Sequence, residues 1–164
     1  MNRLGTDQMP SSIEGGRPAG IVSVMAPLYG RVMATIFTRI INGEIPGTFV
    51  WRDDRCVAFM SINPMARGHA LVVPIQEVDH WVDAPADLTA HLFEVTRLIG
   101  VAQRAAFDCE RVGVIIAGYE VPHMHIHVIP TSAMSELSFA NAAAHVDPAD
   151  LEAAADEIRA HLPS

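Results

Sequence analysis

The chain has 164 residues, half of them hydrophobic, and a formal net charge of −8. This composition is typical of one folded domain, and no apolar run approaches the roughly 20 residues that span a bilayer, so we expect no membrane partner. All 11 basic residues are arginines and they form no cluster, which excludes lysine Schiff-base chemistry and argues against a nucleic-acid polymer as partner.

The first 32 residues differ from the rest of the chain because they are rich in Gly, Pro and Ser. We predict a flexible N-terminal extension over residues 1–32 and one domain over residues 33–164. The beginning of the chain lacks the basic and apolar regions of a secretory signal. The two cysteines, Cys56 and Cys109, form no CxxC pair. We therefore expect a soluble cytoplasmic protein with two reduced thiols.

Three helices are predicted from the spacing of apolar side chains. The first follows Ala34 and ends near Gly43 and Pro46. The second is long and starts at Pro85, and the third follows Asp147, a good N-cap residue. The apolar stripe of the long helix comprises Leu88, Leu92, Val95, Ile99 and Ala102.

Five apolar runs rich in β-branched residues predict five strands. Residues 53–55 form a plausible hairpin turn between the first two of them. Hairpin-joined strands followed by helices favour an α+β domain, in which an antiparallel sheet has its helices on one side. The predicted strands comprise residues 48–53, 56–62, 69–75, 111–118 and 122–130.

The last predicted strand contains three histidines at every second position, in the stretch PHMHIHVIP. Side chains of a strand alternate between its two faces. His123, His125 and His127 should therefore share a solvent-facing side. The intervening residues, Met124, Ile126 and Val128, should pack on the core.

Two kinds of chemistry suit several imidazoles on one face. Neighbouring rings can ligate a metal ion with help from another strand. A neutral imidazole can instead attack phosphorus while its neighbours hold phosphoryl oxygens or pass a proton. The end rings are too far apart to share one ion easily, and Glu120 is the only carboxylate or thiol close by in sequence. These features favour nucleophilic catalysis but leave the metal site as an alternative.

The stretch HMHIHV resembles the alternating histidine and apolar pattern of the histidine triad (HIT) superfamily. Residues 36–80, with their EIP, AFMSINP and GHALVVP segments, are similar to the branch of histidine triad nucleotide-binding proteins, which are nucleoside phosphoramidate hydrolases. The resemblance covers about residues 34–130. It implies a HIT-like α+β fold, with a five-stranded antiparallel sheet, two main helices and a C-terminal helix.

The resemblance also implies an activity. A purine nucleotide would be cleaved at the α-phosphorus through a covalent nucleotidyl-histidine, with no metal or other cofactor, by a homodimer. His125 matches the nucleophile, His127 a phosphate-contacting histidine, His123 a supporting one and His69 a fourth histidine that faces the site. A dinucleoside polyphosphate hydrolase, a nucleotidyl transferase and a nucleotide-binding module with little turnover remain alternatives.

The family's apolar pocket for the base and ribose falls on a set of apolar side chains in this sequence, and a loop residue, Asn63, continues its wall. Each of these apolar residues could equally belong to the core. The pocket positions are Ile36, Phe37, Ile40, Phe59, Ile62 and Val73.

Three departures from the family pattern bear on function. Ser61 stands where that branch usually has an Asp that binds the ribose hydroxyls, which predicts altered ribose recognition. Tyr119 and Glu120 replace a Gln and a Ser or Thr that cradle phosphate, and Glu120 either faces the leaving group or points to solvent. Thr35 and Thr38 occupy the positions of a Cys-x-x-Cys pair that binds structural zinc in some relatives, so we expect no zinc there.

Overall fold

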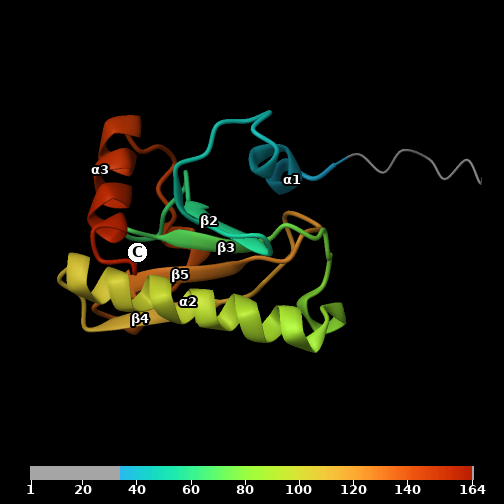
Figure 1. The fold of residues 1–164 in the computed structure, drawn as a ribbon. Coiled ribbons are helices and arrows are strands. Elements are labelled where there is room, and N and C mark those ends of the chain that lie inside the picture. The colour runs from blue at the N-terminus through green and yellow to red at the C-terminus, as the bar shows by residue number, and fades with distance from the viewer. Residues whose placement is uncertain (1–33, 164) are drawn as a thin grey trace, which may run out of the picture. The chain divides into compact units, whose positions relative to one another are not determined.

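Five strands form one antiparallel sheet in the computed structural model, which describes residues 34–163 (Figure 1). Their order across the sheet is β1-β2-β3-β5-β4, so β1 and β4 are the edges. The α+β fold with this sheet is confirmed, whereas the predicted extension over residues 1–32 lies outside the described residues. The strands are β1 (Phe49–Arg52), β2 (Cys56–Met60), β3 (Ala70–Pro74), β4 (Arg111–Ile115) and β5 (Ile126–Thr131).

The three predicted helices are present as α1 (Ile36–Ile41), α2 (Ala86–Ala106) and α3 (Pro148–Arg159). Asp147 caps α3 as predicted, because its carboxylate accepts a hydrogen bond from the N–H of Ala149 at 2.8 Å. Gly43, with a φ of 77°, follows α1 in the left-handed region that favours glycine. Residues 34–163 also contain three short 3-10 helices: η1 (Trp81–Asp83), η2 (Met134–Glu136) and η3 (Phe139–Asn141).

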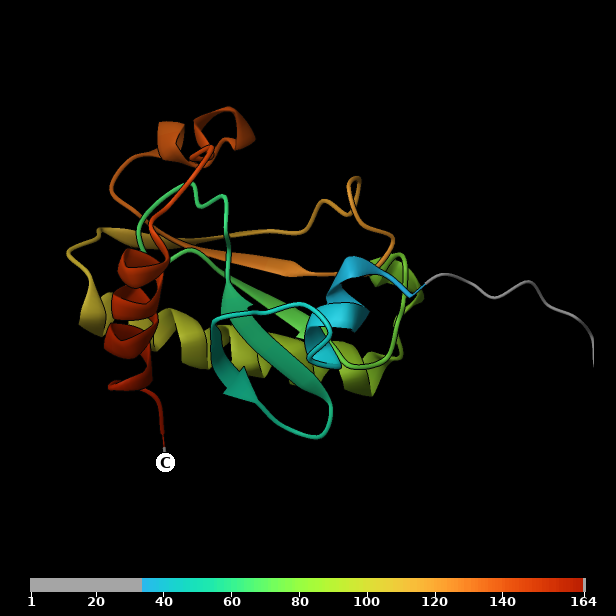
Figure 2. The same ribbon diagram turned by 90° about the horizontal axis from the view of Figure 1, so that it is seen from above.

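The two faces of the sheet pack against different helices (Figures 1 and 2). On one face, Ala58, Val72 and Ile126 join the apolar stripe of α2 and the buried residues of α3 in the larger core cluster. On the other face, α1 covers a smaller cluster. The prediction that all helices lie on one side is therefore wrong for α1, because β2 and β3 carry apolar residues at every position and need cover on both faces. The smaller cluster comprises Phe37, Ile41, Val57, Phe59, Leu71 and Val73.

The histidine strand is shorter and more buried than its sequence predicts. β5 begins at Ile126, so His123 and His125 lie in the irregular segment just before it. The exposed fractions are 0% for His123, 6% for His125 and 8% for His127, so the expected solvent-facing row of histidines is wrong. The rings are buried because aromatic side chains outside the sheet, described below, pack against them. The complementary part of the prediction is right: Met124, Ile126 and Val128 belong to the larger core cluster.

Within residues 34–163, the structure contains no helix of the length and apolar character that a membrane span requires. Cys56 is buried, Cys109 is half-buried, and both are free thiols as expected.

The turn between β1 and β2 is tied to α2 through one carboxylate, that of Asp53. Its Oδ1 accepts hydrogen bonds from the backbone N–H groups of Arg55 and Cys56, each at 2.8 Å. Its Oδ2 accepts from Nε1 of Trp51 at 2.8 Å and from Nε2 of His91 on α2 at 2.9 Å. Burial opposes ionisation of Asp53, but these hydrogen bonds outweigh it and hold the pKa of the carboxyl group well below its usual range.

We expect Asp53→Ala to lower the free energy of unfolding by about 2–3 kcal/mol at pH 7, because it leaves several partly buried donors without an acceptor. Chemical denaturation measures this loss. The exposed neighbour provides a matched control, since Asp54→Ala should change stability by less than about 0.5 kcal/mol. Because the folded pKa of Asp53 is depressed, its contribution is complete above pH ~4 and should fade as the pH falls below that value. Equal losses in the two variants would contradict this role.

Candidate active site

Four histidines gather on the sheet face that α1 covers. His127 lies on β5 opposite Leu71 of β3, and His69 immediately precedes β3. Nε2 of His69 lies 3.0 Å from Nδ1 of His127, and the ring centroids of His125 and His127 are 4.9 Å apart. The structure thus brings together the histidines that the sequence singled out. It assembles them from β5 and from the segments that immediately precede β3 and β5.

His125 is held in one tautomer by its own chain. Nδ1 of the ring lies 2.8 Å from the carbonyl oxygen of His123, which can only accept a hydrogen bond. Nδ1 therefore carries the hydrogen, and Nε2 keeps a free lone pair. Burial lowers the pKa of His125 below its ordinary value, although this hydrogen bond and the charge of Glu120 act in the opposite direction. A neutral imidazole with an unprotonated Nε2 is a competent nucleophile.

His127 is held in the opposite tautomer by a relay that starts at a backbone amide. The N–H of Met65 donates to Nδ1 of His69 at 3.1 Å, so the hydrogen of neutral His69 must be on Nε2. That hydrogen is donated to Nδ1 of His127, which places the hydrogen of His127 on Nε2. Burial, with smaller contributions from neighbouring histidines, lowers the pKa of His69 to about 3 and that of His127 to about 4. The cluster therefore presents a lone pair on His125 and an N–H donor on His127.

His123 plays a different part, because both of its ring nitrogens are engaged inside the protein. Nε2 lies 2.9 Å from the carbonyl oxygen of Pro74, and Nδ1 lies 2.9 Å from Oγ1 of Thr35. Burial lowers the pKa of this ring, against the opposing effects of the Pro74 hydrogen bond and the Glu77 charge. Among the described residues, the ring nitrogens of the cluster left for an outside ligand are Nε2 of His125 and Nε2 of His127.

The apolar positions predicted to form the base pocket lie around α1 and the adjacent strands. Phe37 packs edge-on against His125, with ring centroids 4.9 Å apart, and it also contacts Phe59 at 5.6 Å. Val73 is fully buried beneath them and Ile40 packs against this cluster. By contrast, Ile36 is 47% exposed and Ile62 is 71% exposed, so their side chains are available at the surface.

The polar positions divide between the site and the surface. Ser61 is buried, and its N–H donates to the carbonyl oxygen of His69 at 3.0 Å. Asn63 donates through Nδ2 to the carbonyl oxygens of Ala143 and Ala144, so it ties two loops together. Tyr119 is 96% exposed and does not pack against the histidines, whereas the exposed Glu120 lies close enough for its charge to act on His125.

One aromatic contact was missed by sequence reasoning. Phe139, on η3, places its ring 5.2 Å from that of His127 at an interplanar angle of 80°. It belongs to the segment between β5 and α3 (orange in Figure 2), which the sequence indicates only as a loop. The N–H of Ala143 donates to the carbonyl oxygen of Pro64 at 2.9 Å and so fixes this segment beside the loop between β2 and β3. A single aromatic residue in a loop gives no sequence signal for such a contact.

The residues at the zinc position of some relatives do not fit zinc here. Thr35 and Thr38 offer neutral hydroxyl groups in place of thiolates, and the Thr38 hydroxyl already donates to the carboxylate of Glu77. A separate group, Asp53, Cys56 and His91, lies close enough to share an ion. Its carboxylate is occupied by the turn described above, and burial, with the charge of Asp53, raises the pKa of the Cys56 thiol to about 12. No catalytic step is assigned to either group.

The sheet, its helices and the histidine cluster together define a histidine triad domain. A family model described as the HIT domain matches residues 42–134, and the chain belongs to this family. An uncharacterized HIT-like protein of Methanocaldococcus jannaschii is 37% identical over 99 residues, which cover 58% of this chain and 77% of that protein.

Solved structures agree with this assignment. A HIT-like protein of Bartonella henselae, described as involved in cell-cycle regulation, superposes with a TM-score of 0.70 at 31% identity over 78% of this chain and 96% of that one. A hypothetical histidine triad nucleotide-binding protein of Sulfolobus tokodaii gives a TM-score of 0.68 at 27% identity over 76% and 89% of the two chains.

The buried neutral histidines predict a pH dependence of stability. Because the folded pKa of His69 is depressed, the unfolded chain binds protons first, and stability should fall as the pH drops from about 6.5 towards the folded value. Each such histidine contributes a slope of up to ~1.4 kcal/mol per pH unit. Denaturation curves between pH 7 and pH 5 measure it. His69→Gln should reduce the slope, and His161→Gln, at an exposed position, should leave it unchanged. An unchanged slope in His69→Gln would show that His69 is not held neutral.

Proposed function

We propose that this protein hydrolyses a nucleoside 5′-phosphoramidate or a related phosphoanhydride through a covalent nucleotidyl-histidine on His125. Membership of the HIT family supports a nucleotide-binding or nucleotide hydrolase role. The observation that carries the finer proposal is the pairing of tautomers. Nε2 of His125 has a free lone pair, and Nε2 of the neighbouring His127 carries a hydrogen that it can donate.

The first step forms a bond between Nε2 of His125 and the α-phosphorus. The bond from phosphorus to the leaving nitrogen breaks at the same time, and an amine that was protonated on the substrate departs as the neutral amine with that electron pair. The Nε2–H of His127 donates to a phosphoryl oxygen, where a preorganised donor stabilises developing negative charge. His125 becomes cationic, and its Nδ1–H bond to the carbonyl oxygen of His123 is strengthened by that charge.

The second step is attack of water on the phosphorus. The bond between phosphorus and Nε2 breaks, its electron pair returns to His125, and the nucleoside monophosphate leaves. The proton lost from water is taken up by the free amine in solution, so the enzyme returns to its starting state. Division of one displacement into two steps is the general benefit of covalent catalysis.

The apolar side chains around α1 supply the wall for the purine base in this proposal. Phe37 connects this wall to the nucleophile, because its ring contacts both His125 and Phe59. The exposed side chains of Ile36 and Ile62 extend the wall towards solvent. A dinucleoside polyphosphate hydrolase or a nucleotidyl transferase would use the same intermediate. They differ from the proposal in the leaving group and in the acceptor of the nucleotidyl group.

A nucleotide-binding module with little turnover is the second candidate, and Ser61 favours it. A serine hydroxyl is neutral and has one oxygen, so it accepts ribose hydrogen bonds more weakly than a charged carboxylate with two oxygens. A substrate panel of adenosine phosphoramidate and diadenosine polyphosphates separates these candidates, because binding without release of AMP would support the module.

We also propose that the protein is a homodimer. β4 is an edge strand, and an exposed edge offers unpaired backbone groups to a second chain. Large apolar side chains are also exposed on α2 and on β4 itself. They are Phe93 (45%), Val101 (54%) and Val114 (46%).

His125→Asn should lower turnover of adenosine 5′-phosphoramidate by about a thousandfold or more, because it removes the attacking nitrogen. Release of AMP measures turnover, and a labelled nucleotidyl-enzyme should be trapped with the unsubstituted protein alone. His161→Asn, at an exposed site in the turn after α3, should keep full activity. Retained turnover in His125→Asn would remove His125 as the nucleophile.

Ser61→Asp should tighten binding of AMP by about tenfold, because a charged acceptor strengthens hydrogen bonds from the ribose hydroxyls. Titration calorimetry with AMP measures the change, and 2′,3′-dideoxy-AMP serves as the control ligand. The gain should vanish with the control ligand, since it lacks both hydroxyls. Equal affinities of Ser61→Asp and the unsubstituted protein for AMP would exclude a ribose contact at this position.

A further inference from the structure

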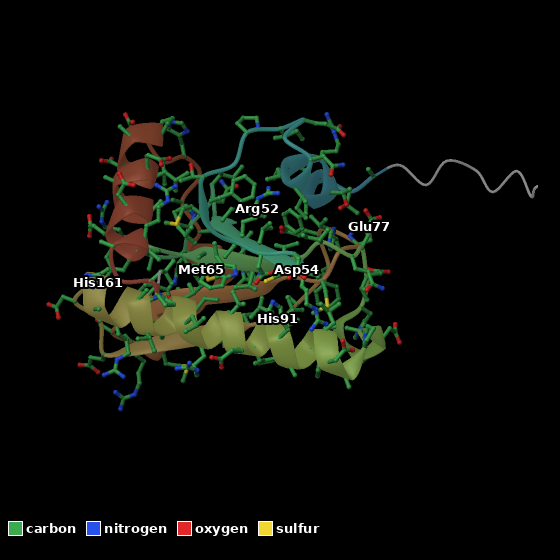
Figure 3. The ribbon with its side chains drawn as sticks, viewed as in Figure 1. Arg52, Asp54, Met65, Glu77, His91 and His161 are labelled. Atoms are coloured by element: carbon green, nitrogen blue, oxygen red, sulfur yellow. The ribbon has the colours of Figure 1, made fainter. Side chains whose placement is uncertain are left out.

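A line of hydrogen-bonding groups connects the surface to the buried ring of His123. Glu77, in the segment after β3, is exposed and lies beside α1 in Figure 3. Its carboxylate accepts a hydrogen bond from the hydroxyl of Thr38. Oγ1 of Thr38 lies 3.0 Å from Oγ1 of Thr35, which in turn lies 2.9 Å from Nδ1 of His123. Neither the triad pattern nor the steps of the proposed reaction use this line of groups.

Which group donates each hydrogen bond follows from the groups at the two ends of the line, the carbonyl oxygen of Pro74 and the carboxylate of Glu77. The carbonyl oxygen of Pro74 can only accept, so Nε2 of His123 carries the hydrogen and Nδ1 of the neutral ring is an acceptor. The hydroxyl of Thr35 must therefore donate to His123. The hydroxyl of Thr38 donates to the carboxylate of Glu77, whose pKa is lowered chiefly by that bond. Both hydroxyl hydrogens are therefore donated outside the threonine pair, and none is left to join the two Oγ1 atoms. Backbone groups make the connection instead: the N–H of Thr38 donates to Oγ1 of Thr35 at 3.2 Å, and the N–H of Thr35 donates to the carboxylate of Glu77 at 3.4 Å.

His123 in turn controls the nucleophile through its backbone. The segment from Val121 to His125 precedes β5 and has no regular secondary structure. It is anchored by the fully buried ring of His123 and by the N–H of Met124, which donates to the carbonyl oxygen of Val78 at 2.7 Å. The carbonyl oxygen of His123 lies in this segment and accepts the hydrogen of Nδ1 on His125. Movement of the His123 ring would therefore shift the acceptor that selects the tautomer of His125.

We propose that Thr35, Thr38 and Glu77 are positioning residues that hold His123, and through its carbonyl oxygen hold His125, in the reactive tautomer. The kinetic part of this inference rests on the proposed hydrolase function, whereas the effect on tautomers does not. Thr35 also caps α1, because its Oγ1 accepts a hydrogen bond from the N–H of Thr38 at 3.2 Å. Capping of α1 does not require the hydrogen bond from Thr35 to His123, and it does not involve the hydrogen bond from Thr38 to the carboxylate of Glu77.

The main test compares Thr35→Val with Thr35→Ser, since serine keeps both the cap and the hydroxyl donor while valine loses both. Nitrogen-15 NMR of the imidazole rings reports the tautomers of His123 and His125 in each purified protein. In Thr35→Val, His125 should become a mixture of tautomers. With adenosine phosphoramidate, kcat should fall about tenfold while KM changes less than about twofold, because the nucleophile is misplaced rather than the pocket. Thr35→Ser should restore the single tautomer and most of kcat.

A second variant removes the surface end of the line without touching the helix cap. Glu77→Ala leaves the N–H of Thr35 and the hydroxyl of Thr38 without their acceptor, so it should loosen Thr35 and lower kcat by about threefold with little change in KM. Glu44→Ala is the matched control, because Glu44 is an exposed glutamate that pairs with Arg39 away from the histidines. Glu44→Ala should leave both kcat and the NMR spectrum unchanged. If Thr35→Val fails to fold, Glu77→Ala still decides the question.

The outcomes separate this inference from the proposed function. Unchanged tautomers and kcat in both Thr35→Val and Glu77→Ala would overturn the positioning role. Equal losses in Thr35→Val and Thr35→Ser would overturn it too, since serine retains the donor. If the unsubstituted protein turns over no phosphoramidate, the proposed function fails, and the NMR comparison alone decides whether these residues hold His123 and His125.

Discussion

The hydrogen bond from Nδ1 of His125 to the carbonyl oxygen of His123 is the contact on which the candidate site depends. Without it, either nitrogen of the neutral imidazole could carry the hydrogen, and Nε2 would have a free lone pair only part of the time. A backbone carbonyl oxygen is a suitable partner because it accepts and cannot donate. The same logic applies to His127, whose tautomer is set through His69 by the amide of Met65.

These contacts also make the burial of four imidazoles tolerable. A polar group removed from water costs free energy unless it finds a hydrogen-bond partner inside the protein. The ring nitrogens of His69 and His123 all have such partners, and each of the other two histidines has one. Burial keeps the rings neutral, and the partners fix which nitrogen is protonated. Stability and reactivity of the cluster therefore depend on the same hydrogen bonds.

The fold could be predicted from the sequence largely because alternation of side chains is a local signal. The apolar stripe of α2, the Asp147 cap and the core role of Met124, Ile126 and Val128 are all encoded by neighbours in the chain. The same signal led to the wrong prediction that the three histidines of the triad face solvent. Period-two spacing places the histidines opposite the core but does not show that α1 covers that face too. That cover comes from residues such as Phe37, far from β5 in the sequence.

The partners of the histidines could not be predicted, since they are ordinary residues brought close by the fold. Thr35 and His123 are separated by 88 positions, and the contact between them leaves no pattern in either segment. The sequence marks Tyr119 and Glu120 as a place where this chain departs from its relatives. The structure directs attention instead to the start of α1, since Tyr119 is almost fully exposed while Thr35 is buried against His123. The family pattern singles out the histidines, and the residues behind them determine how firmly each ring is held.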